Sequence, residues 1–178
     1  MKRKTLVYTI GHSTRSADAF VALLKAHGVA CLVDIRTVER SRHNPQFNED
    51  ALATTLGEHG IRYVRIAGLG GFRRTSPDSP NTAWRNLSFR GYADYMQTAA
   101  FADNLDALIA LARDATVAIM CAEAVPWRCH RSLIADALLV RGIDVREIVS
   151  EAKTAEHALT PFARVDGTTI RYPALAND

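Results

Sequence analysis

The residues best suited to chemistry are concentrated in one short stretch of the chain, between positions 121 and 132. This stretch contains two thiols, a carboxylate, an imidazole and two guanidinium groups, at Cys121, Glu123, Arg128, Cys129, His130 and Arg131. A short apolar run precedes it and a helical pattern follows it, which predicts a turn between a buried strand and a helix. Ordinary turns favour Gly, Asn or Pro. This composition therefore indicates an active or binding site, and we call residues 121–132 the cysteine turn.

The cysteine turn allows three chemistries. Cys121, at a strand end and flanked by Arg128 and Arg131, would be a nucleophile with a lowered thiol pKa. The Cys121–Arg128 spacing weakly resembles the cysteine–arginine cradle of phosphatases and rhodaneses, but it is one residue longer and lacks the glycines. Alternatively, Cys121, Cys129 and His130, with His12, would bind zinc, although seven residues separate two cysteines that zinc sites usually space more closely. In the third interpretation both thiols are buried apolar groups. We predict no metal and no cofactor.

Three further polar clusters each follow a predicted strand. They begin at Gly11, at Asp34 and at Gly68, and each is rich in Arg, His or Ser. In an open parallel sheet the carboxyl ends of all strands lie along one edge, where ligands bind. Four segments that are far apart in sequence should therefore meet at one site.

The predicted catalytic set is His12, Asp34, Cys121 and Glu123. A sheet with strand order 3-2-1-4-5 would place His12 opposite Cys121 and Glu123, where His12 and Glu123 could transfer protons. Each polar member has a structural alternative. Glu123 could pair with a nearby arginine, Asp34 could pair with Arg36, and His12 could bond a loop carbonyl.

Arginine side chains dominate the predicted binding set, because guanidinium groups bind phosphate and stack on bases. The members identified from the polar clusters are Ser13, Arg36, Arg42, Arg128, His130 and Arg131. Two long connections, residues 36–47 and 67–90, are rich in arginine. The second interleaves arginines with Phe72, Trp84 and Phe89, a composition that suits nucleotides or single-stranded nucleic acid. The simpler explanation of the charged residues in both loops is that they form a solvated surface. The sequence Gly68-Leu69-Gly70-Gly71 lacks the Lys-Ser/Thr ending of a P-loop.

The bulk properties are those of a single globular domain. The chain has 178 residues, 48% of them hydrophobic and 23% charged, and no apolar run approaches the length of a membrane span. Three cysteines fit a reducing compartment better than a disulfide framework. We expect a soluble, cytoplasmic protein without a membrane partner. The net charge of +3 is compatible with an anionic small molecule or a nucleic acid as partner, and the sequence does not indicate an oligomeric state.

Strand and helix patterns alternate along the chain. The expected strands are residues 6–11, 30–35, 61–66, 116–121 and 145–149, and the expected helices are 16–27, 48–59, 92–114 with a break near Thr98, and 129–141. Asp166-Gly167 between two β-rich runs predicts a hairpin. We predict an α/β fold, a three-layer α/β/α domain with a mainly parallel sheet of about five strands and a C-terminal hairpin. Residues 1–150 would form the domain, with residues 151–178 packed on it as an extension.

The order of the motifs resembles a known family. The segments are Thr9-Ile10-Gly11-His12-Ser13, Val33-Asp34-Ile35-Arg36, Ser41-Arg42, Phe47-Asn48, Leu69-Gly70-Gly71, Phe89-Arg90-Gly91-Tyr92-Ala93-Asp94-Tyr95-Met96, Met120-Cys121-Ala122-Glu123 and Cys129-His130-Arg131-Ser132. Together they resemble the bacterial and archaeal domain-of-unknown-function family numbered 488, over about residues 5 to 150. Members often carry Pro near position 38, where this chain has Val38. The resemblance supports the fold and the site but carries no established activity, and its Phe89–Met96 motif adds Tyr92 and Tyr95 to the predicted binding set.

The leading hypothesis is an enzyme that acts on a phosphate-bearing or nucleic-acid-derived substrate at the strand carboxyl ends. Two alternatives remain open at this point. One is a non-catalytic nucleic-acid-binding module that uses the basic loops, and the other is a zinc-stabilised domain.

Overall fold

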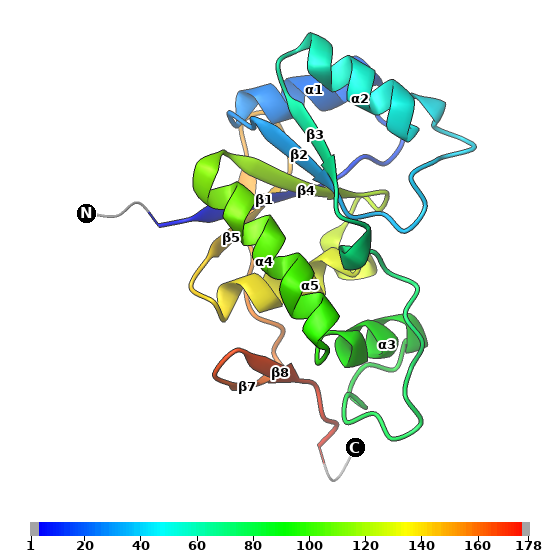
Figure 1. Cartoon of the computed structure of the whole chain (residues 1–178), viewed down its shortest axis with the longest axis vertical. Coiled ribbons are helices and arrows are strands. Elements are labelled where there is room, and N and C mark those ends of the chain that lie inside the picture. Colours follow the sequence, from blue (N-terminus) through cyan, green and yellow to red (C-terminus); the bar gives the residue numbers. More distant parts are fainter. Residues whose placement is uncertain (1–3, 176–178) are drawn as a thin grey trace.

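A six-stranded sheet forms the centre of the molecule in the computed structural model, which describes residues 4–175 (Figure 1). The strands run in the order β3-β2-β4-β1-β5-β6, and all of them are parallel except β6, which pairs antiparallel with β5. Their bounds are Leu6–Gly11 (β1), Cys31–Asp34 (β2), Arg62–Arg65 (β3), Val117–Cys121 (β4), Asp144–Ile148 (β5) and Thr154–Glu156 (β6).

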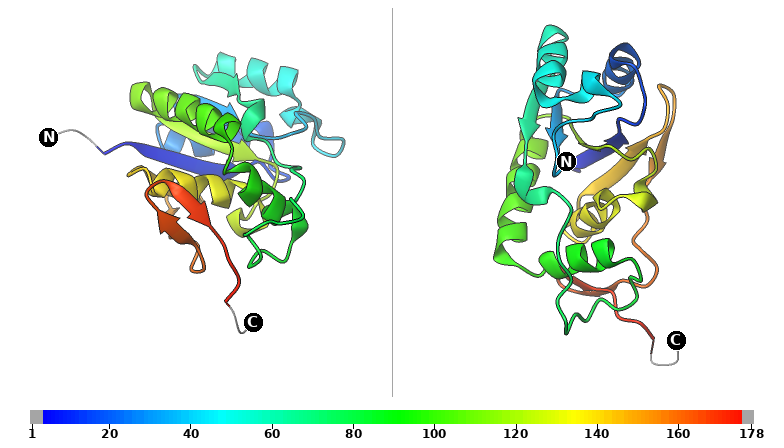
Figure 2. Two further views of the ribbon diagram at one scale, coloured as in Figure 1. Left: turned by 60° about the horizontal axis from the view of Figure 1, so that its bottom comes forward. Right: turned by 90° about the vertical axis from the view of Figure 1, so that its right-hand side faces the viewer.

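Helices cover both faces of the sheet and confirm the predicted three layers (Figures 1 and 2). The helices α1 (Ala17–Ala26) and α2 (Glu49–Glu58) pack on one face, where Phe20, Leu24, Leu52 and Leu56 meet strand side chains such as Ile10 and Leu32. The helices α3 (Leu87–Tyr95), α4 (Ala99–Asp114) and α5 (Arg131–Leu139) pack on the other, around Val33, Val117 and Ile119. Alternate residues of one buried strand thus serve two separate cores.

Local sequence signals fix several helix ends. Ser16 caps α1 by accepting a hydrogen bond from the Ala19 amide at 3.1 Å. Thr98 caps α4 in the same way, so the helical run breaks there as predicted. The run also begins earlier than expected, at Leu87, because Asn86 caps α3 by accepting hydrogen bonds from the amides of the next turn.

The strand order differs from the expected 3-2-1-4-5 in one respect. Strand β4 lies between β2 and β1, so β2 and β1 are not adjacent, although β1 and β4 are neighbours as expected. The edge strand β6 was not expected from the sequence, since Thr154–Glu156 is short and polar. No helix among residues 4–175 combines the length and apolar character that crossing a bilayer requires.

The predicted hairpin forms from β7 (Arg164–Asp166) and β8 (Thr169–Arg171), with Gly167 in the turn at a φ of +62°. The chain after it returns to the main body. Tyr172 is fully buried, and its hydroxyl donates to Asp136 on α5 at 2.8 Å. The C-terminal segment therefore packs on α5, on the side of the sheet that α3, α4 and α5 cover.

Candidate functional site

A cavity of about 480 Å³ opens at the carboxyl ends of β2 and β4, where the sequence predicts a composite site. Three segments line it: residues 36–40 after β2, parts of residues 71–89 in the long loop and α3, and residues 121–130 of the cysteine turn. We call it the sheet-edge cavity. Two of the four predicted segments, those after β2 and β4, contribute most of its polar side chains.

The two thiols of the cysteine turn lie next to each other on the wall of the sheet-edge cavity. Cys121 Sγ and Cys129 Sγ are 2.7 Å apart, and both residues are almost fully buried. Cys121 is the last residue of β4, whereas Cys129 follows a single 3-10 turn, η3 (Pro126–Arg128). The amides of Arg128 and Cys129 bond to carbonyls within the turn. The turn is thus a folded unit that holds Cys129 against the end of the strand.

Arg131 lies behind these thiols and is completely buried. Its Nη1 donates to Cys121 Sγ at 2.6 Å and to the Glu123 carbonyl at 2.6 Å. Its Nη2 donates to Glu147 Oε1 on β5 at 2.7 Å and to the Ala124 carbonyl at 3.2 Å. The Arg131 guanidinium therefore connects the cysteine turn with β4 and β5.

These contacts determine the ionisation of the two thiols. Burial raises the pKa of Cys121, but the hydrogen bond from Cys129 and the charge and hydrogen bond of Arg131 outweigh it and lower the pKa of Cys121 below its ordinary value. The hydrogen bond to Cys121 and burial raise the pKa of Cys129 well above its ordinary value. When the pair loses its first proton, the negative charge therefore develops on Cys121, beside Arg131.

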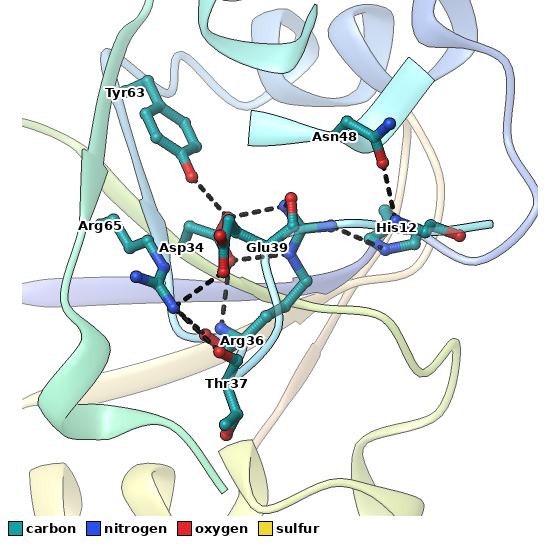
Figure 3. A network of polar contacts seen from close by, with 9 residues as sticks. His12, Asp34, Arg36, Thr37, Glu39, Asn48, Tyr63 and Arg65 are labelled. Atoms are coloured by element: carbon teal, nitrogen blue, oxygen red, sulfur yellow. Dashed lines mark hydrogen bonds and ion pairs between the residues drawn. The ribbon is translucent and has the colours of Figure 1, made fainter. Parts of the chain in front are cut away.

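Asp34 and Arg36 form a second buried ion pair at the end of β2 (Figure 3). Arg36 Nε and Nη2 donate to the two carboxylate oxygens of Asp34 at 2.9 and 2.7 Å, and the Tyr63 hydroxyl donates to the same carboxylate at 2.6 Å. Arg36 lines the sheet-edge cavity, whereas Asp34 is fully buried behind it. Asp34 thus acts as a fixed anchor for Arg36, in line with the structural alternative for this residue.

His12 and Ser13 lie close to the cysteine turn through their backbones. The amides of His12 and Ser13 donate to the carbonyls of Cys121 and Ala122, at 2.9 and 3.0 Å. The His12 ring, however, stacks on Phe47 and has its Nε2 3.4 Å from Arg36 Nη1. Neither His12 nor Ser13 is among the residues that line the sheet-edge cavity within the described part of the chain. The His12 ring therefore contacts Phe47 and Arg36, and within residues 4–175 no hydrogen bond joins it to Glu123.

The predicted arginines separate into two groups. Arg36 and Arg128 line the sheet-edge cavity, as do Glu123 and His130. Arg42 is exposed and is not part of the lining, whereas Arg40, two residues earlier, is. Arg40 was not singled out from the sequence, because a loop without periodicity gives no sign of which side chains line a cavity.

Three aromatic or imidazole side chains of the predicted set hold the neighbouring loop in place. The hydroxyls of Tyr92 and Tyr95 donate to the carbonyls of Leu69 and Gly68 at 2.9 and 2.7 Å. The His130 ring packs against Tyr92, with 4.9 Å between ring centroids, and burial lowers the pKa of His130 to about 4. His130 is therefore neutral at pH 7, and the two tyrosine hydroxyls are already engaged by the fold.

A second cavity, of about 390 Å³, lies on the far side of the cysteine turn. Arg15, Trp127, Arg131 and Glu147 are among its lining residues. Glu147, which also accepts a hydrogen bond from Thr9, was missed by sequence reasoning. A carboxylate inside the predicted strand 145–149, where it follows Arg146 between apolar residues, was the available signal. Within residues 4–175 no three His, Cys, Asp or Glu side chains are arranged to hold a metal ion, so Cys121, Cys129 and His130 do not form a zinc set there.

Comparison with protein families gives one match, to the family described as "Domain of unknown function DUF488", over residues 16–138. The chain belongs to this family. It matches none of the curated proteins and none of the solved structures with which it was compared.

The DUF488 match includes most of the site but not all of it. It spans β2, β4 and the cysteine turn, and therefore every residue that lines the sheet-edge cavity. His12 on the N-terminal side and Glu147 on the C-terminal side lie outside the matched range. The matched part of the DUF488 domain thus carries both thiols, while the carboxylate that pairs with Arg131 comes from the strand beyond it.

Proposed function

We propose that this protein is an enzyme that uses the Cys121 thiolate as a nucleophile on a phosphate-bearing substrate of the nucleotide or nucleic-acid type, bound in the sheet-edge cavity. The observation that carries the proposal is the 2.6 Å contact between Arg131 Nη1 and Cys121 Sγ on the wall of that cavity. A buried guanidinium that donates to a sulfur favours the thiolate, which is the reactive form of cysteine.

The surroundings of Cys121 support an anionic substrate. Arg36, Arg40 and Arg128 line the same cavity. One guanidinium group can bind two phosphate oxygens at the same time. The amides of Arg128, Cys129 and Arg131 already bond within the turn. Binding would therefore depend on arginine side chains, and not on a backbone cradle of the kind that phosphatases use.

Aromatic side chains at the cavity support a nucleotide or nucleic-acid substrate. Phe72 and Phe89 both belong to the lining, and Phe72 is 80% exposed with a left-handed φ of 57°. An aromatic ring held in the solvent offers a face on which a base can stack, with a free energy of about 1–3 kcal/mol per base.

The proposed reaction has two balanced steps. Cys121 Sγ forms a bond to phosphorus while the bond from phosphorus to the leaving oxygen breaks, and the Glu123 carboxyl gives its proton to that oxygen. Water then attacks the phosphorus, passes its proton to the Glu123 carboxylate, and the sulfur–phosphorus bond breaks. Inorganic phosphate leaves and the Cys121 thiolate is restored.

The test measures inorganic phosphate released from 4-nitrophenyl phosphate, nucleoside monophosphates and a short 5′-phosphorylated single-stranded oligonucleotide. We expect release from at least one of them, loss of at least about 100-fold in Cys121→Ser, and unchanged release in Cys31→Ser, whose thiol lies within β2. Phosphate release that survives Cys121→Ser would refute the proposal. Salt-dependent binding of the oligonucleotide without turnover would also refute it, and would favour a non-catalytic nucleic-acid-binding module.

A further inference from the structure

The second thiol of the site has no part in the proposed phosphate chemistry. Cys129 nevertheless lies with its sulfur 2.7 Å from that of Cys121, although seven residues separate them along the chain. The sulfurs of a disulfide are about 2.05 Å apart. A small closing movement would therefore join the two, and the folded turn between them already holds Cys129 in place.

We propose that Cys121 and Cys129 are a redox pair, which a hydroperoxide converts to an intramolecular disulfide. In the first step the Cys121 thiolate attacks the peroxide oxygen that carries the hydrogen. The oxygen–oxygen bond breaks, Cys121 becomes a sulfenic acid, and the other oxygen leaves as an alcohol or water after taking a proton from solvent. In the second step Cys129 sulfur attacks the sulfenic sulfur, and the released hydroxide takes the Cys129 proton and leaves as water. A dithiol reductant returns the pair to two thiols and is itself oxidised.

The positions of the three cysteines explain why Cys121 reacts first. Cys121 lines the sheet-edge cavity, so a small peroxide can reach it, and Arg131 donates a hydrogen bond to its sulfur. Cys129 lines the same cavity, but its sulfur donates a hydrogen bond to Cys121 and accepts one from the Arg131 amide, not from the guanidinium. Cys31 is buried in β2, which pairs with a strand on each side, and it lines neither the sheet-edge cavity nor the second cavity.

The contacts of Arg131 are also compatible with the disulfide form of the pair. Disulfide formation removes the negative charge of Cys121, which would leave a buried guanidinium short of a partner. Arg131 keeps its ion pair with Glu147 at 2.7 Å and its bonds to the carbonyls of Glu123 and Ala124. The guanidinium therefore has acceptors in both redox states.

The disulfide does not depend on the proposed phosphate chemistry. If both hold, oxidation removes the nucleophile, and the redox pair is a reversible switch of the enzyme. Phosphate release and disulfide formation are measured on the same samples, so failure of one is distinguished from failure of the other.

The test uses the trypsin cleavage sites that lie around Cys121 and Cys129. Trypsin cleaves after Arg113, Arg128 and Arg131, which puts Cys121 on peptide 114–128 and Cys129 on peptide 129–131. The full chain is treated with one equivalent of hydrogen peroxide, its remaining thiols are blocked with N-ethylmaleimide, and it is digested without reductant. We expect the number of free thiols to fall from three to one, and the two peptides to appear joined until dithiothreitol separates them.

Two variants keep the test decisive. In Cys129→Ser the sulfenic acid of Cys121 has no partner, so we expect dimedone to label Cys121 alone. Cys31→Ser is the matched control, because it removes a buried thiol outside the pair and should form the same linked peptides. A link to Cys31, dimers joined by disulfides, or irreversible oxidation of Cys121 in the native chain with Cys129 still free would each overturn the proposal.

Discussion

Arg131 and Glu147 form an ion pair beneath the cysteine turn, with Nη2 2.7 Å from Oε1, the arginine fully buried and the carboxylate 12% exposed. The same guanidinium donates to Cys121 Sγ through its other nitrogen. Two strands that are separated by β1 in the sheet, β4 and β5, are thus connected through one side chain. The stability of the fold and the reactivity of the Cys121 thiol therefore both depend on Arg131. Substitutions at Arg131 and Glu147 can separate the two effects.

The first prediction concerns stability. Arg131→Met leaves Glu147 buried without its partner, and loss of one member of a buried pair costs about 3–5 kcal/mol of unfolding free energy. The double variant Arg131→Met/Glu147→Leu removes both charges and should recover most of that loss. Urea denaturation of the three proteins measures the difference. A double variant no more stable than the single one would show that the ion pair is not the source of the effect.

The second prediction concerns the reactivity of Cys121. Because Arg131 lowers the pKa of Cys121, its removal in the double variant raises that pKa and reduces the thiolate fraction at neutral pH. The rate of Cys121 alkylation by iodoacetamide should fall at pH 7, and the midpoint of its pH profile should move upwards. Arg128→Gln removes an equal charge from an exposed side chain and should move the midpoint far less. Equal shifts in the two variants would contradict a specific role for Arg131.

The third prediction concerns the close approach of β1 to the cysteine turn. A Cβ atom added at Gly11 would lie 1.6 Å from the Glu123 carbonyl oxygen, so backbone must move to accept it. We expect Gly11→Ala to lose about 1–3 kcal/mol of stability and to slow alkylation of Cys121. Gly57→Ala is the matched control, because nothing lies within 4 Å of its added methyl group on α2. That variant should be neutral or more stable by about 0.5–1 kcal/mol.

Much of the fold follows from patterns that the sequence states directly. Apolar runs predicted the five parallel strands, and Thr98 and Gly167 marked a helix break and a turn where the structure has them. Strand order was harder, because a crossover between β2 and β4 is compatible with the same alternation of elements. The position of β4 between β2 and β1 depends on packing over long sequence distances.

The site was predictable in location more than in detail. Polar residues at strand ends predicted a site at the edge of the sheet, and the sheet-edge cavity opens at that edge. The direction of each side chain was not predictable, since Arg131 turns inward to a thiol and Arg40, not Arg42, turns to the cavity. Glu147 was overlooked because it lies within the strand β5 and not in the loop that follows it.

The fourth prediction uses that difference between two nearby arginines. Arg40→Gln and Arg128→Gln each remove a positive charge from the lining of the sheet-edge cavity, whereas Arg42→Gln removes one from outside it. We expect the first two to weaken binding of a 5′-phosphorylated oligonucleotide several-fold and to reduce the salt dependence of that binding. Fluorescence anisotropy at a series of salt concentrations measures both. Equal weakening by Arg42→Gln would indicate a general surface charge effect.

The fifth prediction concerns acid stability and rests on His130. Burial lowers the pKa of His130 in the folded protein to about 4, below the ordinary value of 6.5 that applies when the chain is unfolded. The unfolded chain therefore binds a proton more readily, so this histidine favours folding above pH 6.5 and loses that contribution as the pH falls towards 4. Its share of the slope is at most about 1.4 kcal/mol per pH unit. Denaturation between pH 4 and 7 should show a shallower slope for His130→Gln than for the native chain, and an unchanged slope for His59→Gln, whose side chain is exposed. An identical slope in His130→Gln and the native chain would mean that this imidazole is not held neutral by the fold.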